Sequence, residues 1–370
     1  MPHTLPPPVW VATPESFAAL AADLSKQSRI AVDTESNSLH AYREQVCLIQ
    51  FSTETDYLVD PFALSDLSPL APIFADPKIE KVFHAAEYDL ICLYRDFGFT
   101  FSNLFDTMQA ARILGRDKVG LEGVLAEYFG VAVNKKFQKA DWGARPLTSE
   151  QINYARLDTH YLLSLRDMLY ADLAAAGRWE LAREDFRRAC WVGEQPVSRN
   201  GPAWERLSRR RDLSARELTL LRELCEAREI IAERLDRPPF KVVDDDILIA
   251  IARGAPSTRE ELLGLGLSER QVGRWANEML AAVARGVEAP LVRRPRPERP
   301  DDAVLVRLEK LKSWRKKAAQ KMGVESDIVL PRPFLFSLAE RGPRDLKSVM
   351  ESSPWRLEQF GSQILDVLGG

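Results

Sequence analysis

The chain has 370 residues, of which 45% are hydrophobic, 28% charged and 9% aromatic. This composition is typical of a soluble globular protein and excludes a disordered chain, and the length predicts two or three domains. No apolar run reaches the roughly 18 residues of a membrane helix, and the first residues lack the pattern of a signal peptide. We therefore expect a cytoplasmic protein that makes no membrane contact.

The formal net charge of −3 hides an asymmetry along the chain. Residues 1–200 hold 20 Lys and Arg against 27 Asp and Glu, whereas residues 201–370 hold 31 against 27. An acidic first part can be offset by bound cations, and a mildly basic second part suits a polyanion. The four cysteines and four histidines are scattered singly, which argues against disulfides, a zinc site and a dithiol pair. A metal site would therefore use oxygen ligands.

The first part of the chain predicts an α/β domain. Thr13 and Pro14 begin a helix that should run to about residue 25, and alternating apolar residues predict strands at 29–35, 45–51 and 57–59, arranged as an antiparallel meander. Helices are expected at 66–74, 85–97, 106–114 and 121–129, with a strand at 81–84, and a long helix is expected at 148–176, followed by another at 178–191. This order predicts a mixed sheet flanked by helices.

The second part of the chain predicts two tandem helical modules. Residues 203–288 read as helical, and residues 290–300 form a stiff, basic, Pro-rich linker. Four residues recur with a single offset of 87, which indicates a repeat: Arg228 and Arg315, Leu248 and Leu335, Ala252 and Ala339, Pro256 and Pro343. The predicted domains are 1–200, 203–288 and 304–370, with the linker at 289–303.

Four acids are predicted to converge on one site. Asp33 and Glu35 share one face of a strand that must be at least half buried, where like charges repel unless a cation or a proton lies between them. Asp89 and Asp158 lie on otherwise apolar helix faces. The structural alternatives are a solvated strand face for the pair, and a capping or Arg-paired role for each helical Asp.

Carboxylates from one strand and two helices suit a pair of Mg²⁺ or Mn²⁺ ions about 4 Å apart, which can activate water for phosphodiester hydrolysis. Tyr154 lies one helical turn before Asp158, and its hydroxyl could orient the attacking water. Core packing is the alternative for this ring.

Three segments resemble the exonuclease motifs of the DEDD superfamily in its Tyr-containing subclass: Asp33-Thr34-Glu35, His84 through Asp89, and Tyr154 through Asp158. Longer stretches are similar to the ribonuclease D family and to the related exosome-associated exonuclease of eukaryotes: Phe105-Asp106-Thr107, Lys139 through Leu147, and Asp158 through Leu163. Both helical modules resemble the helicase and ribonuclease D C-terminal (HRDC) domain. The family often has a bulky residue where this chain has Ser36, which affects expected contacts to the terminal nucleotide.

The resemblance implies a ribonuclease H-like catalytic fold followed by two HRDC-like helical bundles. It implies metal-dependent 3′ to 5′ trimming of RNA ends, such as those of tRNA precursors, with release of nucleoside 5′-monophosphates. By the matching positions, Asp33, Glu35, Asp89 and Asp158 would be the metal ligands and Tyr154 the water-orienting residue. The partner would be RNA with a free 3′ end, and a monomer is expected. The alternatives are a DNA proofreading or repair exonuclease and a noncatalytic RNA-binding scaffold.

Six further residues are candidates for substrate contact. Leu39 and His40 could pack on the 3′-terminal base, and His84 could touch the scissile region. Lys139, Trp142 and Arg145 combine cations with an aromatic ring and could hold a single strand. The alternatives are surface turn residues, a histidine that merely ends its strand, and a solvated loop.

Overall fold

The structure is a computed structural model, and it describes residues 5–132, 135–193, 201–209, 212–293 and 300–369. The predicted end of the first domain, at residue 200, and most of the Pro-rich linker lie outside these residues. The chain forms two compact units: one comprises Met1–Glu35, Val46–Gln195 and Arg299–Gly370, and the other Ser36–Gln45 and Pro196–Glu298.

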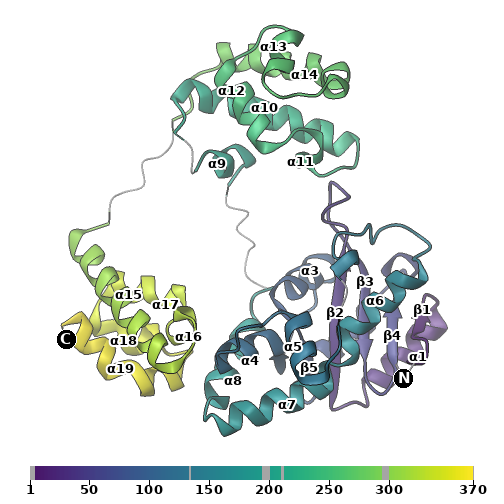
Figure 1. Ribbon diagram of the computed structural model, residues 1–370, viewed down its shortest axis with the longest axis vertical. Coiled ribbons are helices and arrows are strands. Elements are labelled where there is room, and N and C mark those ends of the chain that lie inside the picture. The colour runs from purple at the N-terminus through teal and green to yellow at the C-terminus, as the bar shows by residue number, and fades with distance from the viewer. Residues whose placement is uncertain (1–4, 133–134, 194–200, 210–211, 294–299, 370) are drawn as a thin grey trace. The chain divides into compact units, whose positions relative to one another are not determined.

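A six-stranded mixed sheet forms the centre of the first unit (Figure 1). Its order is β1-β4-β3-β2-β5-β6, with bounds Val9–Val11 (β1), Arg29–Ser36 (β2), Val46–Ser52 (β3), Asp56–Val59 (β4), Glu80–Phe83 (β5) and Leu104–Asp106 (β6). The β3–β4 pair is antiparallel as predicted, whereas β1 joins β4, β2 joins β5 and β5 joins β6 in parallel. The mixed sheet is confirmed, and β2 is an interior strand that lies between β3 and β5.

Helices cover this sheet and bury its core. They are α1 (Pro14–Leu24), α2 (Ala71–Ala75), α3 (Glu87–Phe97), α4 (Thr107–Leu114), α5 (Leu121–Phe129), α6 (Ser149–His160), α7 (Leu162–Ala175) and α8 (Trp179–Ala189). The main core joins residues of β2, β3 and β5 to apolar residues of α1, α3, α4 and α7. A smaller core lies between α6 and the β3–β4 pair and contains Leu48, Leu58, Trp142 and Ala155.

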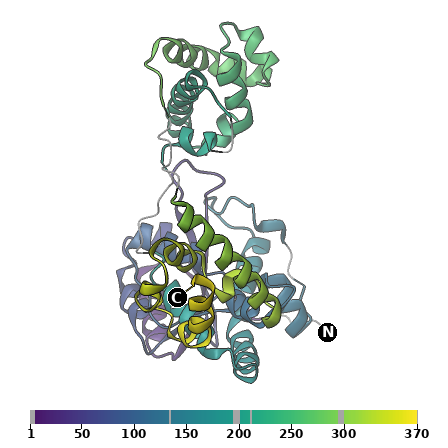
Figure 2. The same ribbon diagram turned by 90° about the vertical axis from the view of Figure 1, so that its left-hand side faces the viewer.

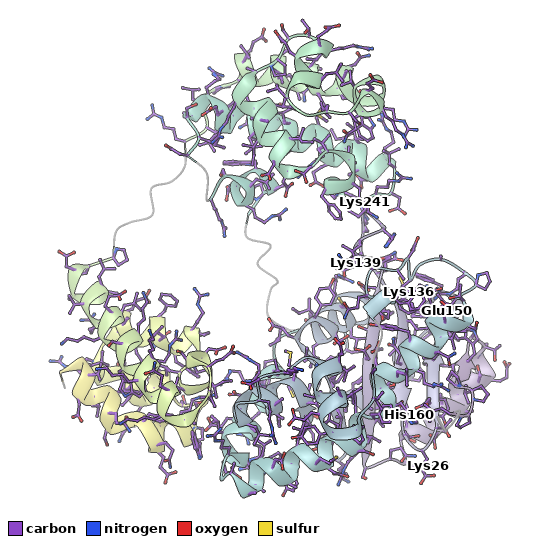
Figure 3. All side chains as sticks on the ribbon, in the orientation of Figure 1. Lys26, Lys136, Lys139, Glu150, His160 and Lys241 are labelled. Atoms are coloured by element: carbon purple, nitrogen blue, oxygen red, sulfur yellow. The ribbon has the colours of Figure 1, made fainter. Side chains whose placement is uncertain are left out.

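The single helix predicted for 148–176 is wrong, because α6 and α7 are separate helices that meet at Tyr161. The last turn of α6 is fixed to the sheet: the hydroxyls of Thr159 and Ser52 lie 2.7 Å apart, and His160 Nδ1, labelled in Figure 3, lies 2.9 Å from the Asp56 carboxylate. The chain then turns so that α7 packs against α4. Apolar periodicity continues through the break, so the pattern alone does not reveal it.

The first unit also contains the C-terminal helices α15 (Asp302–Met322), α16 (Ser326–Val329), α17 (Arg332–Arg341), α18 (Leu346–Val349) and α19 (Pro354–Leu368). Figure 2 shows α15 as the long helix of this bundle. The bundle packs on α8 through Arg356, which is fully buried and donates to Asp185 at 2.7 and 3.0 Å and to Glu184 at 3.2 Å.

The second unit contains the helices α9 (Ala203–Ser208), α10 (Ala215–Arg234), α11 (Pro239–Val242), α12 (Asp245–Gly254), α13 (Arg259–Gly264) and α14 (Glu269–Glu288). The helices α10, α11 and α12 begin 87 residues before α15, α16 and α17, respectively. The predicted repeat is therefore confirmed in register. Among the residues that the structure describes, no helix is both long enough and apolar enough to span a membrane.

Candidate active site

Three of the four predicted acids form a tight cluster. Carboxylate oxygens of Asp33, Glu35 and Asp158 all lie within 4.8 Å of one another. The first two project from the same side of β2, as strand alternation requires, and Asp158 comes from the last turn of α6. A strand and a helix far apart in sequence thus bring three oxygen donors together.

The fourth acid, Asp89, is hydrogen-bonded to the strand β2. It lies in the first turn of α3 and is 6% exposed. Its Oδ1 accepts hydrogen bonds from the backbone N–H of Thr34 at 3.1 Å and from the Thr34 hydroxyl at 2.5 Å. Because Thr34 stands between Asp33 and Glu35, these bonds fix the start of α3 against the acidic end of β2.

All four acids line one cavity of about 760 Å³, together with Tyr154 and His84. Its other walls include Tyr88, Lys118, Glu122 and Gln138. The cavity is large enough for a nucleotide-sized ligand.

The electrostatics of the cavity favour bound cations. Burial, followed by the charges of the neighbouring acids, raises the pKa values of Asp33 and Glu35 well above the ordinary range. Burial raises the pKa of Asp89 to about 7, and burial and the charge of Asp89 raise the pKa of Asp158 to about 8. Four carboxylates that resist ionisation together, and that offer only oxygen donors, fit Mg²⁺ or Mn²⁺.

Tyr154 is held as a neutral phenol beside these acids. Burial and then the charges of Asp158, Glu35 and Asp33 raise the pKa of Tyr154 above that of a free phenol. Its ring lies 5.8 Å from the ring of Phe137 and 6.0 Å from that of Trp142, measured between centroids. The hydroxyl can therefore donate or accept a hydrogen bond at neutral pH without acting as a phenolate.

Asp106 shapes the turn that leads from β5 into α3. Its carboxylate accepts from the backbone N–H groups of Ala85 and Ala86 at 3.1 and 2.9 Å, and from those of Met108 and Gln109 at the start of α4 at 2.9 and 3.0 Å. Ala85 has a left-handed φ of 63°, which is unfavourable for a residue with a Cβ. One carboxylate thus holds a strained turn and caps a helix.

The hydrogen bonds around His84 define its tautomer. The Thr107 hydroxyl donates to the Phe83 carbonyl at 3.0 Å, and its oxygen lies 2.9 Å from His84 Nδ1. A carbonyl can only accept a hydrogen bond, so the single hydroxyl hydrogen of Thr107 is donated to Phe83. The Thr107 oxygen must therefore accept a hydrogen bond from Nδ1–H of His84. Burial lowers the pKa of His84 to about 4, so Nε2 carries a lone pair, and the side chain lines the cavity with a hydrogen-bond acceptor.

The sequence also matches known protein families. A family model described as "3'-5' exonuclease" matches residues 8–174, and the HRDC domain model matches residues 217–283 and 304–368. Ribonuclease D of Granulibacter bethesdensis is 31% identical over 99% of this chain and 93% of its own length, and that of Jannaschia sp. is 30% identical over 100% and 96%. This chain belongs to the ribonuclease D family.

Solved structures agree with this ribonuclease D assignment. The chain superposes on Escherichia coli RNase D, described as "an exoribonuclease involved in structured RNA processing", with a TM-score of 0.72, 27% identity and 98% coverage of both chains. The catalytic core of Trypanosoma brucei RRP6 gives 0.67 and 30%, with coverage of 79% and 82%. The RRP6-like proteins 1, 3 and 2 of Arabidopsis thaliana are 35–36% identical, but the match spans only 48%, 31% and 29% of their lengths.

In this ribonuclease D family member, the predicted substrate residues separate into three groups. His84 lines the cavity. Trp142 and Arg145 do not: Trp142 is 1% exposed in the smaller core, and Arg145 donates to Asp60 at 2.8 and 2.9 Å and to the Cys47 carbonyl at 2.6 Å. The burial of Trp142 contradicts its expected role in gripping a strand, whereas Arg145 is exposed and its role stays a prediction.

The other three predicted substrate residues stay predictions. Lys139 is exposed and is labelled in Figure 3, near the Lys136–Glu150 pair, whose charged atoms are 2.9 Å apart. Leu39 and His40 belong to the segment that groups with the second unit, where the Tyr42 N–H donates to Asp236 at 3.0 Å.

Sequence reasoning missed several residues of the site. Thr34 and Asp106 had a signal, since each stands inside a motif named above. Their roles depend on contacts to distant groups, the Asp89 carboxylate for Thr34 and the backbone N–H groups of Ala85 and Ala86 for Asp106. Lys118 and Gln138 line the cavity from loops and follow no periodic pattern, so the sequence offered no means of finding them.

Proposed function

We propose that this chain is a divalent-metal-dependent 3′ to 5′ exoribonuclease that releases nucleoside 5′-monophosphates. The observation that carries the proposal is the convergence of four carboxylates from β2, α3 and α6 on one cavity that also contains the Tyr154 ring. The coarser assignment to the ribonuclease D family supports it.

In this mechanism Asp33, Glu35, Asp89 and Asp158 would hold two ions of Mg²⁺ or Mn²⁺. When bound, these ions stabilise the charge that develops on the scissile phosphate and activate water. The neutral Tyr154 hydroxyl orients the attacking water through a hydrogen bond. The water oxygen bonds to phosphorus, the bond to the 3′ oxygen of the preceding nucleotide breaks, and that oxygen leaves with a proton as the new 3′ end.

His84 supplies an acceptor for the terminal nucleotide. Because Nδ1–H is engaged by Thr107, only Nε2 is available to a ligand, and it requires a donor such as the 2′ hydroxyl of ribose. Deoxyribose lacks this hydroxyl, so this contact would favour RNA over DNA.

We extend the proposal to the arrangement of the chain and its substrate. The domains would be 1–200, 203–288 and 304–370, separated by the linker at 289–303. The substrate would be RNA with a free 3′ end, including structured precursors such as those of tRNA, and the protein would act as a cytoplasmic monomer.

The decisive experiment follows 5′-labelled RNA with Mg²⁺, with Mn²⁺ and with EDTA, and repeats each reaction with a blocked 3′ end. A ladder that shortens from the 3′ end, and that the block prevents, establishes polarity and reaction together. Asp89→Asn and Asp158→Asn should abolish release of mononucleotides while the fold is retained. Glu54→Gln, on an exposed loop, is the matched control with the same change in charge and should remain active.

Two outcomes would replace the proposal. Equal degradation of matched DNA and RNA single strands would favour a DNA exonuclease. Binding of RNA without any release of nucleotides in Mg²⁺ or Mn²⁺ would favour a noncatalytic scaffold.

A further inference from the structure

The two helical repeats place one arginine at the same position. Arg228 on α10 and Arg315 on α15 are 87 residues apart, and each donates Nη1 to the equivalent carbonyl, Val243 at 2.8 Å and Leu330 at 3.0 Å. In both, Nε is buried without a hydrogen-bond partner among the residues that the structure describes. The second repeat thus copies the local geometry of the first.

The repeats differ in the charge beside this arginine. In the first repeat Asp245, which begins α12, pairs with Arg228 at 2.6 Å. The equivalent position in the second repeat is Arg332, which begins α17. Burial lowers the pKa of Arg315, the charge of Asp327 raises it, and the charge of Arg332 lowers it by a smaller amount. The second repeat therefore has a cation where the first has a carboxylate.

This cation faces an open site. Arg315, Lys316 and Arg332 line a cavity of about 610 Å³. In the described part of the chain, Lys316 and Arg332 form no ion pair. The acids of the same wall, Glu325 and Asp327, both pair with Arg112, at 2.5 and 2.7 Å. With Arg112, four cations stand against two carboxylates, so the wall carries a net charge of +2.

We propose that this cavity of the second repeat binds a phosphate group, which takes the place of the carboxylate that Asp245 supplies in the first. A phosphate offers several acceptor oxygens, and guanidinium groups bind such oxygens in a fixed fork geometry. The group can belong to an RNA backbone or be free in solution. The site is separate from the catalytic cavity, and the proposal does not depend on nuclease activity.

The test uses the full chain in EDTA, so that no cleavage occurs. One arm measures thermal stabilisation by inorganic phosphate, and the other measures binding of a short single-stranded RNA and its dependence on salt. The key variant is Arg332→Asp, which rebuilds the ion pair of the first repeat. The matched control is Arg344→Asp, an exposed position with the same change in charge.

We expect Arg332→Asp to retain at least the wild-type Tm without ligand and to lose phosphate stabilisation, or to weaken RNA binding about tenfold with a salt slope lower by about 1. A response in the phosphate arm assigns free phosphate, and a response in the RNA arm alone assigns the backbone; either supports the proposal. Arg332→Gln covers the case in which Arg332→Asp misfolds. If the folded variant matches Arg344→Asp in both arms, the proposal is wrong.

Discussion

The acidic cluster makes the stability of the metal-free chain depend on pH. The pKa values of Asp89 and Asp158 are about 7 and about 8 in the folded chain, whereas unfolded carboxyls titrate near pH 4. The folded form holds more protons between these limits, so stability falls as pH rises through them. In EDTA we expect the Tm to fall from pH 5 to pH 9, as measured by calorimetry.

The same titration predicts how the metal response varies. Protons compete with cations for these carboxylates, so Mn²⁺ should raise the Tm more at pH 8 than at pH 5. Asp158→Asn should reduce the response, and Glu54→Gln should leave it unchanged. Equal metal shifts at the two pH values would contradict the assigned ligand set.

The fixed tautomer of His84 predicts a change in substrate binding. His84→Ala removes the Nε2 acceptor and should raise KM for RNA roughly tenfold, the size of one net hydrogen bond, with a smaller effect on DNA. His84→Gln retains an acceptor and should recover part of the loss. The test compares KM and kcat on both substrates; a loss in kcat alone, equal for RNA and DNA, would exclude this role.

At the scale of elements, the β5–α3 turn depends on Asp106. Asp106→Ala removes the cap of α4 and leaves the N–H groups of Ala85 and Ala86 without their acceptor. We expect a loss of about 2 kcal/mol or more in the free energy of unfolding, the upper end of cap losses. Denaturant titration measures it.

The control for this change is Asp301→Ala, which removes an exposed N-cap from α15. It should cost about 1 kcal/mol and leave activity unchanged. Equal losses in the two variants would mean that the turn does not depend on Asp106.

Most elements follow from the sequence, and the exceptions have physical causes. The helix α5 and the offset of 87 were predicted correctly, because apolar spacing and glycine caps are local signals. The strand β6 was missed because it has only three residues. The break at Tyr161 was missed because it depends on contacts of Thr159 and His160 with Ser52 and Asp56, in strands far away in the sequence. The four acids were found by their unlikely apolar neighbours. Trp142 was misassigned because composition does not show which way a side chain points.

At the scale of the whole molecule, Arg356 joins the C-terminal bundle to α8. Burial opposes ionisation of Asp185, but Arg356 and then Arg188 lower its pKa below the ordinary range. Arg356→Met removes the buried guanidinium that Glu184 and Asp185 share and leaves Arg188 as the cation beside Asp185. It should cost about 3 kcal/mol, measured by denaturant unfolding. The exposed variant Arg344→Met is the control and should change stability by less than about 0.5 kcal/mol.

The pH dependence of this contact has the opposite sign to that of the acidic cluster. A carboxyl with a lowered folded pKa stabilises the fold above its unfolded pKa and loses that effect as pH falls through the folded value. Wild-type stability should therefore drop below about pH 4, and Arg356→Met should show a smaller drop. An equally steep acid transition in the variant would exclude the pair as its cause.

The Arg356 contact also affects the order of events during synthesis. Asp185 and Arg356 are separated by 171 positions, so at about 5–20 residues per second the ribosome needs roughly 9–34 s to supply the arginine after the acid. Throughout that interval the outer face of α8 carries two carboxylates without their final partner. The nascent exonuclease domain therefore completes its surface only when α19 has been translated.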